Sequence, residues 1–125
     1  MHGLHLTADL RGCSPGTPAL TDPQALRRVC LAAVEDAGLQ PVGELFHTFP
    51  GAHTQAGGVT GVVLLAESHL AVHTWPEMEA VTLDVYVCNF GADNRQKAHT
   101  LLDQLLAAFA PARVERHALE RGGAA

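Results

Sequence analysis

The sequence predicts an α+β two-layer sandwich: a mainly antiparallel sheet with two helices on one face. Stretches in which apolar and polar residues alternate recur along the 125 residues, whereas only two stretches have the apolar spacing of an amphipathic helix. The strand-like stretches follow one another in groups, which favours hairpins over regular strand-helix alternation. A chain of this length forms one core, so residues 1–125 are expected to be a single domain.

The first two elements are a strand and a helix. Apolar residues alternate through residues 3–10, which predicts a half-buried strand ending at Gly12. Thr21 or Asp22 can cap a helix that begins at a proline, and a glycine follows its apolar stripe as a stop signal. We therefore expect this helix over about residues 22–37.

The middle of the chain predicts four strands, the last two joined as a hairpin. If the hairpin turn is centred near Glu77 and Met78, residues whose numbers sum to about 155 pair across it. This register places Cys88 opposite the Glu67–Ser68 end. The strands are expected over residues 42–49, 59–66, 69–74 and 81–87.

The last part of the chain predicts a second helix and a final strand. Asp93 can cap a helix whose apolar stripe extends to Phe109, and Pro111 closes it. The final strand is expected over residues 114–119, with a frayed end from Arg121 onwards.

Composition excludes several classes of partner and location. A net charge of −5 with only 8 Lys and Arg argues against nucleic-acid binding, which needs clustered basic residues. The 3 cysteines lack zinc-ribbon or disulfide-framework spacing, so reduced thiols in the cytoplasm are expected. The sequence contains no signal-peptide pattern and no apolar run of about 18 residues, so no membrane association is expected.

Ionisable and nucleophilic groups gather in the stretch from Glu67 to Glu77. Ser68 is a weak nucleophile that needs a base, and His73 lies nearby in the sequence. A straight strand would separate Ser68 from His73 by roughly 16 Å and place them on opposite faces, so joint action requires a bend just after Ser68. An ordinary serine at a strand end is the plain alternative.

Two other chemistries fit this stretch poorly. A Ser-His-Asp hydrolase lacks the Gly-x-Ser-x-Gly turn, and Asp84 sits in the middle of a strand. His69, His73 and Cys88 could offer ligands to zinc, but no further pair completes a set of four, so no metal is expected.

The stretch from Glu67 to Glu77, followed by Asp84–Cys88, resembles the signature of the prokaryotic S-adenosylmethionine decarboxylase proenzymes. Two departures stand out: Thr60 replaces the usual serine, and residues 51–57 look like an insertion. The resemblance extends along the chain through Gly3–Leu6, Gly12–Cys13, Phe46–Phe49, Gly58–Val63 and Glu120–Gly122.

The resemblance implies a self-processing, pyruvoyl-dependent enzyme. Ser68 would attack the carbonyl of Glu67, and His73 would assist the elimination that converts Ser68 into a pyruvoyl group. This would divide the chain into residues 1–67 (β chain) and 68–125 (α chain). A ketone next to an amide can form a Schiff base with a substrate amine and accept the electrons left by CO₂. Cys88 would return a proton to the α-carbon.

The same resemblance implies the substrate contacts. Glu77 would bind ribose hydroxyls, Phe49 would lie on adenine or near the sulfonium, Leu70 would contact substrate, and Thr60 would support processing. Each also has a structural interpretation: Phe49 as a core aromatic, Glu77 as a solvated turn residue, and Cys88 as a small buried hydrophobe.

The expected function is decarboxylation of S-adenosylmethionine, which supplies the aminopropyl donor for spermidine synthesis. One alternative keeps the pyruvoyl chemistry but acts on ornithine or arginine. The other is an unprocessed homologue that serves as a regulatory subunit. Because one sheet face carries few charges, a homodimer of cleaved protomers is also expected.

Overall fold

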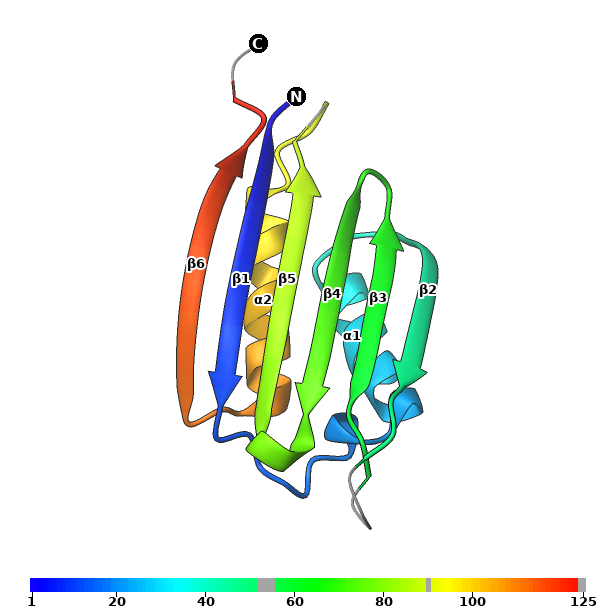
Figure 1. The fold of residues 1–125 in the computed structure, drawn as a ribbon. Coiled ribbons are helices and arrows are strands. Elements are labelled where there is room, and N and C mark those ends of the chain that lie inside the picture. The colour runs from blue at the N-terminus through cyan, green and yellow to red at the C-terminus, as the bar shows by residue number, and fades with distance from the viewer. Residues whose placement is uncertain (52–55, 90, 124–125) are drawn as a thin grey trace.

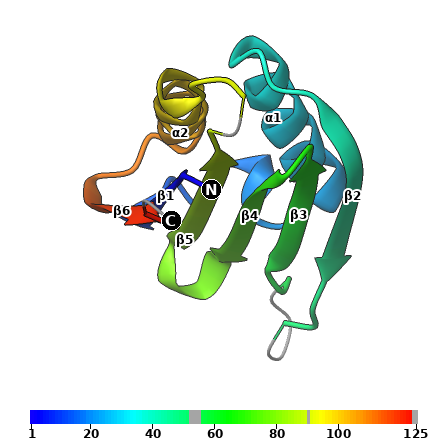
Figure 2. The same cartoon turned by 90° about the horizontal axis from the view of Figure 1, so that it is seen from above.

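The computed structural model describes residues 1–51, 56–89 and 91–123, and within them the chain forms one antiparallel sheet covered on one face by two helices (Figures 1 and 2). The six strands run in the order β2-β3-β4-β5-β1-β6. This arrangement confirms the predicted α+β sandwich. The elements are β1 (Gly3–Arg11), η1 (Pro18–Leu20), α1 (Pro23–Asp36), β2 (Pro41–Thr48), β3 (Val59–Leu65), β4 (Ser68–Trp75), η2 (Pro76–Met78), β5 (Ala80–Cys88), α2 (Arg95–Phe109) and β6 (Arg113–Arg121).

The two helices start differently. Asp22 caps α1 as predicted, because its carboxylate accepts the N–H of Gln24 at 2.9 Å. The N-cap of α2 is Asn94, one residue after the predicted Asp93, although the Asp93 carboxylate accepts the N–H of Arg95 at 3.1 Å. The Asn94 side chain is engaged elsewhere, since its Nδ2 donates to the carbonyl of Cys88 at 2.9 Å. The start of α2 is thereby tied to the end of β5.

The β4–β5 hairpin has the predicted register. His69 pairs with Tyr86 and His73 pairs with Thr82, so the numbers of the paired residues sum to 155. The short helix η2 forms the turn, in which Glu79 adopts a left-handed conformation with φ of 51°. Continued past Ser68, this register brings Cys88 level with Glu67, at the top of β4 and β5 in Figure 1.

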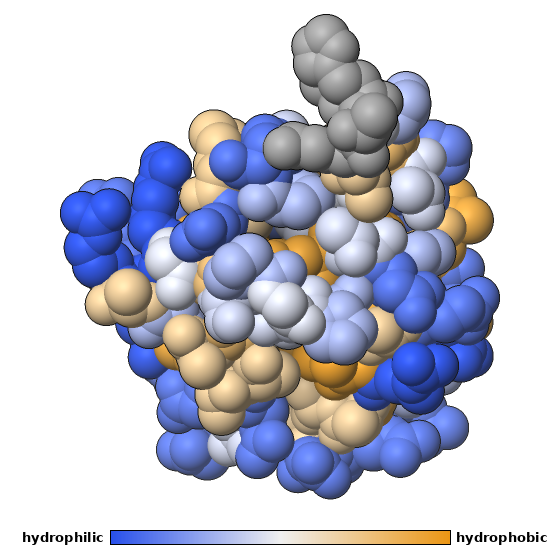
Figure 3. All heavy atoms as spheres, turned by 90° about the horizontal axis from the view of Figure 1, so that it is seen from below, coloured by the Kyte–Doolittle hydropathy of each residue, from blue (hydrophilic) through white to orange (hydrophobic). Residues whose placement is uncertain are grey.

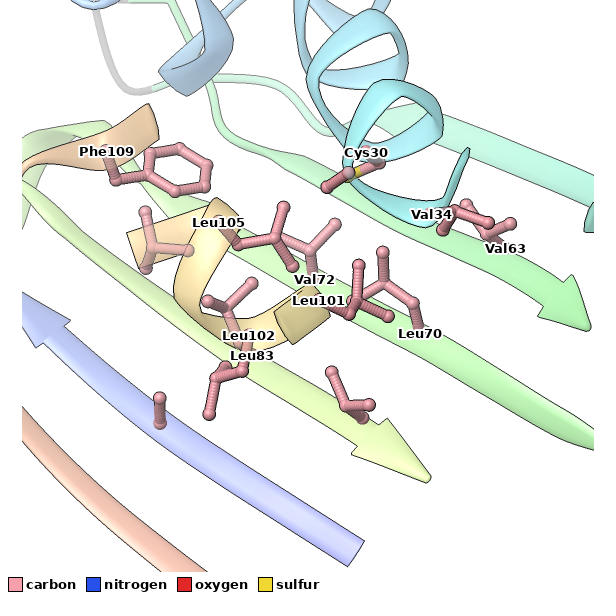
Figure 4. Close-up of a cluster of buried hydrophobic side chains, with 14 of the residues drawn as sticks. Cys30, Val34, Val63, Leu70, Val72, Leu83, Leu101, Leu102, Leu105 and Phe109 are labelled. Carbon is pink, nitrogen blue, oxygen red and sulfur yellow. The ribbon is translucent and has the colours of Figure 1, made fainter. Parts of the chain in front are cut away.

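The core lies between the sheet and the helices, where α2 packs its apolar stripe on β5 and β1 while α1 covers β3 and β2 (Figure 4). Burying each large apolar side chain contributes about 1.5–3 kcal/mol. The buried hydroxyl of Thr74 is satisfied within this core, because it donates to the carbonyl of Leu20 at 2.7 Å and accepts the N–H of Val59 at 2.8 Å. These bonds fix the start of β3 beside β4.

Among the described residues, none forms a helix on the other face of the sheet (Figure 2). We call it the outer face; alternate residues of each strand point to it, including His69, Ala71, His73 and Trp75 of β4.

The final strand is longer than predicted: Arg121 pairs with Gly3 and belongs to β6, so it is not part of a frayed end. Within the described residues, neither helix has the length and apolarity that crossing a membrane requires.

Candidate active site

The Glu67–Ser68 bond lies in a tight turn that carries backbone strain. Leu65 pairs with Ser68, so only Ala66 and Glu67 connect β3 to β4. Glu67 has φ of 57°, at a turn position where Gly or Asn is usual. The left-handed conformation costs a residue with a side chain about 1–2 kcal/mol. The strain therefore sits on the acyl side of the bond that the sequence singles out.

Ser68 is held by the main chain of the neighbouring strand. Its Oγ accepts a hydrogen bond from the backbone N–H of Cys88 at 3.1 Å. The hydroxyl is partly buried, and Cys88 is partly exposed, unlike the two buried cysteines Cys13 and Cys30. The structure therefore brings together Glu67, Ser68 and Cys88, three of the predicted site residues.

His73 lies at the opposite end of β4. It is paired across the β3–β4 ladder with Thr60, whose Oγ1 lies 3.2 Å from the His73 Nδ1. The other side of the imidazole stacks on Trp75, with ring centroids 6.4 Å apart. If Nδ1 is engaged by the hydroxyl, Nε2 remains available as a base.

The bend that joint action of Ser68 and His73 would need within one chain is absent. β4 continues without interruption from Ser68 to Trp75 and pairs along its length with both neighbours. Five residues of strand separate the two side chains by roughly 16 Å. The strand stays straight because Leu70 and Val72 are anchored in the core, each with 0% exposure. Ser68 and His73 of one chain therefore cannot touch.

A surface cavity opens near the His73 end of the hairpin. Phe49 and Glu77 line it, together with Pro50, Gly51 and residues 56–58. The Phe49 ring also packs against Trp75, with centroids 5.9 Å apart and planes inclined at 52°. Residues 52–55 of the predicted insertion lie outside the described residues. At this end of the molecule, apolar patches lie between hydrophilic side chains (Figure 3).

Known proteins resemble this chain over most of its length. The family model for S-adenosylmethionine decarboxylase matches residues 4–122. A relative from Aquifex aeolicus called S-adenosylmethionine decarboxylase proenzyme is 36% identical over 120 residues, covering 96% of this chain and 81% of its own. One from Pyrococcus furiosus with the same name is 34% identical over 108 residues, covering 86% and 73%. The chain belongs to the S-adenosylmethionine decarboxylase family.

Solved structures of the S-adenosylmethionine decarboxylase family agree with the fold. The crystal structure of the adenosylmethionine decarboxylase from Aquifex aeolicus superposes with a TM-score of 0.84 at 34% identity, covering 98% of this chain and 92% of that one. The Trypanosoma brucei AdoMetDC-delta26 monomer, at 13% identity, shares the fold with a TM-score of 0.57 over 90% of this chain and 44% of that one. The sheet and both helices therefore have the family arrangement.

Leu70, to which the family resemblance assigned a substrate contact, directs its side chain into the core. The Leu70 side chain is fully buried in the core, because it occupies a helix-facing position of β4. Its side chain packs beneath the sheet and does not line the Phe49–Glu77 cavity. Leu70 thus helps to keep β4 straight between the two ends of the site.

The two histidines of β4 that could have been zinc ligands have different contacts in this structure. His69 stacks on Tyr86, with ring centroids 5.7 Å apart, while His73 is engaged by Thr60. Within residues 1–51, 56–89 and 91–123, no three His, Cys, Asp or Glu side chains gather as a metal site would require. The histidines instead form two separate groups on the outer face.

One of these groups was missed by reasoning from the sequence. A hollow on the outer face is lined by His5, His69, Tyr86 and Arg121, and Asp84 contacts His5; we call these five residues the Tyr86 cluster. The His5 Nε2 lies 3.0 Å from an Asp84 oxygen, and the Arg121 guanidinium carbon lies 6.0 Å from the centre of the Tyr86 ring. Its members come from four strands, which come together through the pairing of β1 with β5 and β6 and of β4 with β5.

Proposed function

We propose that the protein is a self-processing, pyruvoyl-dependent decarboxylase of S-adenosylmethionine. The observation that supports this best is the turn at Glu67, which combines a left-handed residue with a serine hydroxyl held beside it by the Cys88 N–H. Strain in the ground state favours a reaction that removes the constraint. A serine that merely ended a strand would need neither feature.

Processing would begin with attack of the Ser68 Oγ on the Glu67 carbonyl carbon. The amide C–N bond breaks as the C–O bond forms, so residue 67 becomes an ester of Ser68. A base then removes the Ser68 α-proton, and the ester leaves as the Glu67 carboxylate; His73 is proposed as this base. Water completes the conversion of residue 68 to pyruvoyl, with loss of ammonia. The products are residues 1–67 and 68–125.

In the processed enzyme, this chain's residues would bind substrate and supply a proton. The pyruvoyl group supplies a carbonyl that binds the substrate amine and withdraws electrons as CO₂ departs. Cys88 would donate its thiol proton to the carbon that lost CO₂, since it lies at the same end of the hairpin as residue 68. The group would form in place, because its carbon atoms are those of Ser68 itself.

The cavity at the other end of the hairpin supports a nucleoside substrate. Phe49 and Trp75 offer aromatic surface for adenine, and the exposed Glu77 carboxylate can accept hydrogen bonds from ribose hydroxyls. Ornithine and arginine have neither an aromatic base nor a diol. This favours S-adenosylmethionine, whose decarboxylated product is the aminopropyl donor for spermidine synthesis.

A homodimer would reconcile the two separated halves of the site. Within one chain, Ser68 and Cys88 lie at one end of the β4–β5 hairpin, while His73 and Glu77 lie at the other. Two sheets that pack by their outer faces in opposite directions would bring the Ser68 end of each hairpin to the His73 of the partner subunit. The outer face offers apolar surface for such packing, including Leu45 at 69% and Leu64 at 49% exposure.

The three free cysteines fit a cytoplasmic location.

Intact mass and CO₂ release test the proposal together. Denaturing mass spectrometry of purified protein should give two chains that meet between Glu67 and Ser68, the second lacking ammonia relative to a serine-ended chain. Carboxyl-labelled S-adenosylmethionine should then release CO₂ far faster than ornithine or arginine. A full-length chain with no carbonyl trappable by a hydrazine would favour the regulatory alternative. Equal turnover of ornithine would overturn the choice of substrate.

A further inference from the structure

The Tyr86 cluster holds one tyrosine ring from three sides on an otherwise open sheet face. The ring stacks on His69 and meets the edge of His5, with centroids 6.2 Å apart and planes at 83°. Arg121 lies over the ring, and its Nη1 is 3.5 Å from the His5 Nδ1. His5 in turn contacts Asp84 through Nε2. These contacts give the phenol a fixed direction.

That direction carries the Tyr86 hydroxyl over Gly3. A Cβ added at Gly3 would lie 2.5 Å from the Tyr86 Oη, so only glycine leaves room for the ring. Gly3 is the cross-strand partner of Cys88. The adjacent pair of residues, His2 and Asn89, is hydrogen-bonded, because the Asn89 N–H donates to the His2 carbonyl. Hydrogen-bonded and non-hydrogen-bonded pairs alternate along an antiparallel ladder, so Gly3 and Cys88 form a non-hydrogen-bonded pair. Facing Cβ positions in such a pair are about 4.5–5.5 Å apart.

The hydroxyl and the Cys88 side chain therefore occupy neighbouring positions of the same sheet face, where a change of rotamer can turn the sulfur toward the hydroxyl. Its partner in the structure is the Met1 Sδ at 3.9 Å, and a thioether is a weak acceptor. A thiolate would be a much stronger acceptor, because hydrogen bonds to an ionised group are roughly twice as strong as neutral ones. The arrangement thus favours a new bond when the sulfur becomes charged.

We propose that Tyr86 is a positioning residue for Cys88, whose hydroxyl donates a hydrogen bond to the Cys88 sulfur after the thiol has given up its proton. The inference rests on the proposed function for the role of Cys88. In that step the S–H bond breaks, its electron pair stays on sulfur, and a C–H bond forms at the carbon that lost CO₂. The proton that restores the thiol comes from water through the Tyr86 hydroxyl.

Alkylation of Cys88 by iodoacetamide measures this bond without any turnover. The protein used is full-length Ser68→Ala, which cannot process itself. Cys13 and Cys30 are buried, and burial raises the pKa of the Cys30 thiol to about 12. Burial also raises the pKa of Cys13, aided by the charge of Glu79. The label therefore reports on Cys88, and peptide mass spectrometry verifies its position.

The other ionisable groups near Cys88 are the same in every variant, so they cannot produce a difference between them. Those on the neighbouring elements are the terminal amine of Met1, His2, His5, Glu67, His69, Asp84, Asp93, Arg95, Glu120 and Arg121.

Tyr86→Phe in this background keeps the ring and removes only the donor. Losing a donor to the thiolate disfavours the thiolate, so the rise of the alkylation rate should move to higher pH. At neutral pH the rate should fall roughly threefold to tenfold. Gly3→Ala, which displaces the ring, should shift the profile in the same direction. Thr7→Val, on the outer face of β1 further from Cys88, serves as the control and should match the parent.

An alkylation profile of Tyr86→Phe that superimposes on the parent profile overturns the inference, whether or not the processed enzyme decarboxylates its substrate. A shifted profile in a protein whose processed form releases no CO₂ supports the Tyr86–Cys88 pairing and contradicts the proposed function. The two failures are therefore distinguishable.

Discussion

The backbone N–H of Cys88 donates a hydrogen bond to the Oγ of Ser68 over 3.1 Å. The bond joins the end of β5 to the start of β4, across the turn that carries the strained Glu67. It engages a lone pair of the hydroxyl and leaves the hydroxyl proton free to be given up. Because the donor belongs to the main chain, this orientation of Ser68 does not depend on the Cys88 thiol. Processing and turnover should therefore be separable by mutation.

Replacing Cys88 by alanine should leave processing largely intact and impair turnover. The N–H that orients Ser68 survives the substitution, whereas the proton donor is lost. We expect pyruvoyl-containing protein by mass spectrometry and a decarboxylation rate lower by roughly 10²- to 10⁴-fold. The substrate carbon could also be protonated wrongly, which would inactivate the enzyme by transferring the substrate amine to residue 68.

Two comparisons make the Cys88→Ala result decisive. Cys30→Ala removes a buried thiol from the core and should retain both processing and turnover. His73→Ala should instead accumulate full-length chain or its ester form, which hydroxylamine cleaves. A Cys88→Ala enzyme that decarboxylates at the parent rate would assign the proton to another residue.

Glu67→Gly should slow self-cleavage. A φ of 57° is strained for glutamate and unstrained for glycine. Relief of about 1 kcal/mol of strain corresponds to roughly a fivefold change in an equilibrium or rate constant. We expect the half-time of chain cleavage, followed on denaturing gels, to lengthen by about that factor. Glu67→Ala retains the strain and controls for loss of the carboxylate; equal half-times for the two variants would show that strain is irrelevant.

The hairpin register was predictable from the sequence because its determinants are local. Alternation on both sides of Trp75–Glu79 leaves few ways to fold the hairpin, and a slip by one residue would expose Leu70 or Val72. The helices were predictable for the same reason, apart from the one-residue shift at Asn94. That shift depends on the contact of Asn94 with the Cys88 carbonyl, which forms only in the folded chain.

Two features of the site depend on contacts that the sequence does not display. The positive φ of Glu67 follows from the two-residue connection imposed when β3 and β4 pair. The Tyr86 cluster joins residues from both ends of the chain, since Arg121 contacts His5 only after β6 has paired with β1. A pattern along one strand shows which face a residue occupies but not which strand lies beside it.

Thr60→Val should impair processing, whereas Thr60→Ser should not. The Thr60 Oγ1 lies 3.2 Å from the His73 Nδ1 and helps to fix the imidazole plane. Valine keeps the shape but removes this bond, worth about 1 kcal/mol, so cleavage should slow by roughly fivefold. Serine keeps the hydroxyl and is expected to cleave at least as fast. Thr82→Val, at the residue paired with His73 on its other side, is the control. Equal cleavage by the Thr60→Val and parent chains would contradict the role of this bond.

A mixture of two inactive variants should recover one working site. Ser68→Ala has no nucleophile and His73→Ala has no base, so each protein alone should remain uncleaved. The straight β4 keeps these residues roughly 16 Å apart in one chain, so they would have to meet between subunits. In a mixed dimer, the intact Ser68 of the His73→Ala chain would face the intact His73 of the partner subunit. Co-expression should therefore cleave the His73→Ala chain and leave the Ser68→Ala chain whole, which mass tags of different length would reveal.

The control for this experiment is a single chain that carries both substitutions, co-expressed with the parent. In the dimer of this double variant with a parent chain, one shared site lacks the Ser68 nucleophile and the other lacks the His73 base. The parent chain in that dimer should therefore not be cleaved. If each chain instead used its own Ser68 and His73, the parent would be cleaved normally in that mixture, and the two single variants would never restore each other. Cleavage of the His73→Ala chain, which only a mixed dimer with a shared site can produce, distinguishes the two arrangements even if the yield of mixed dimers is low.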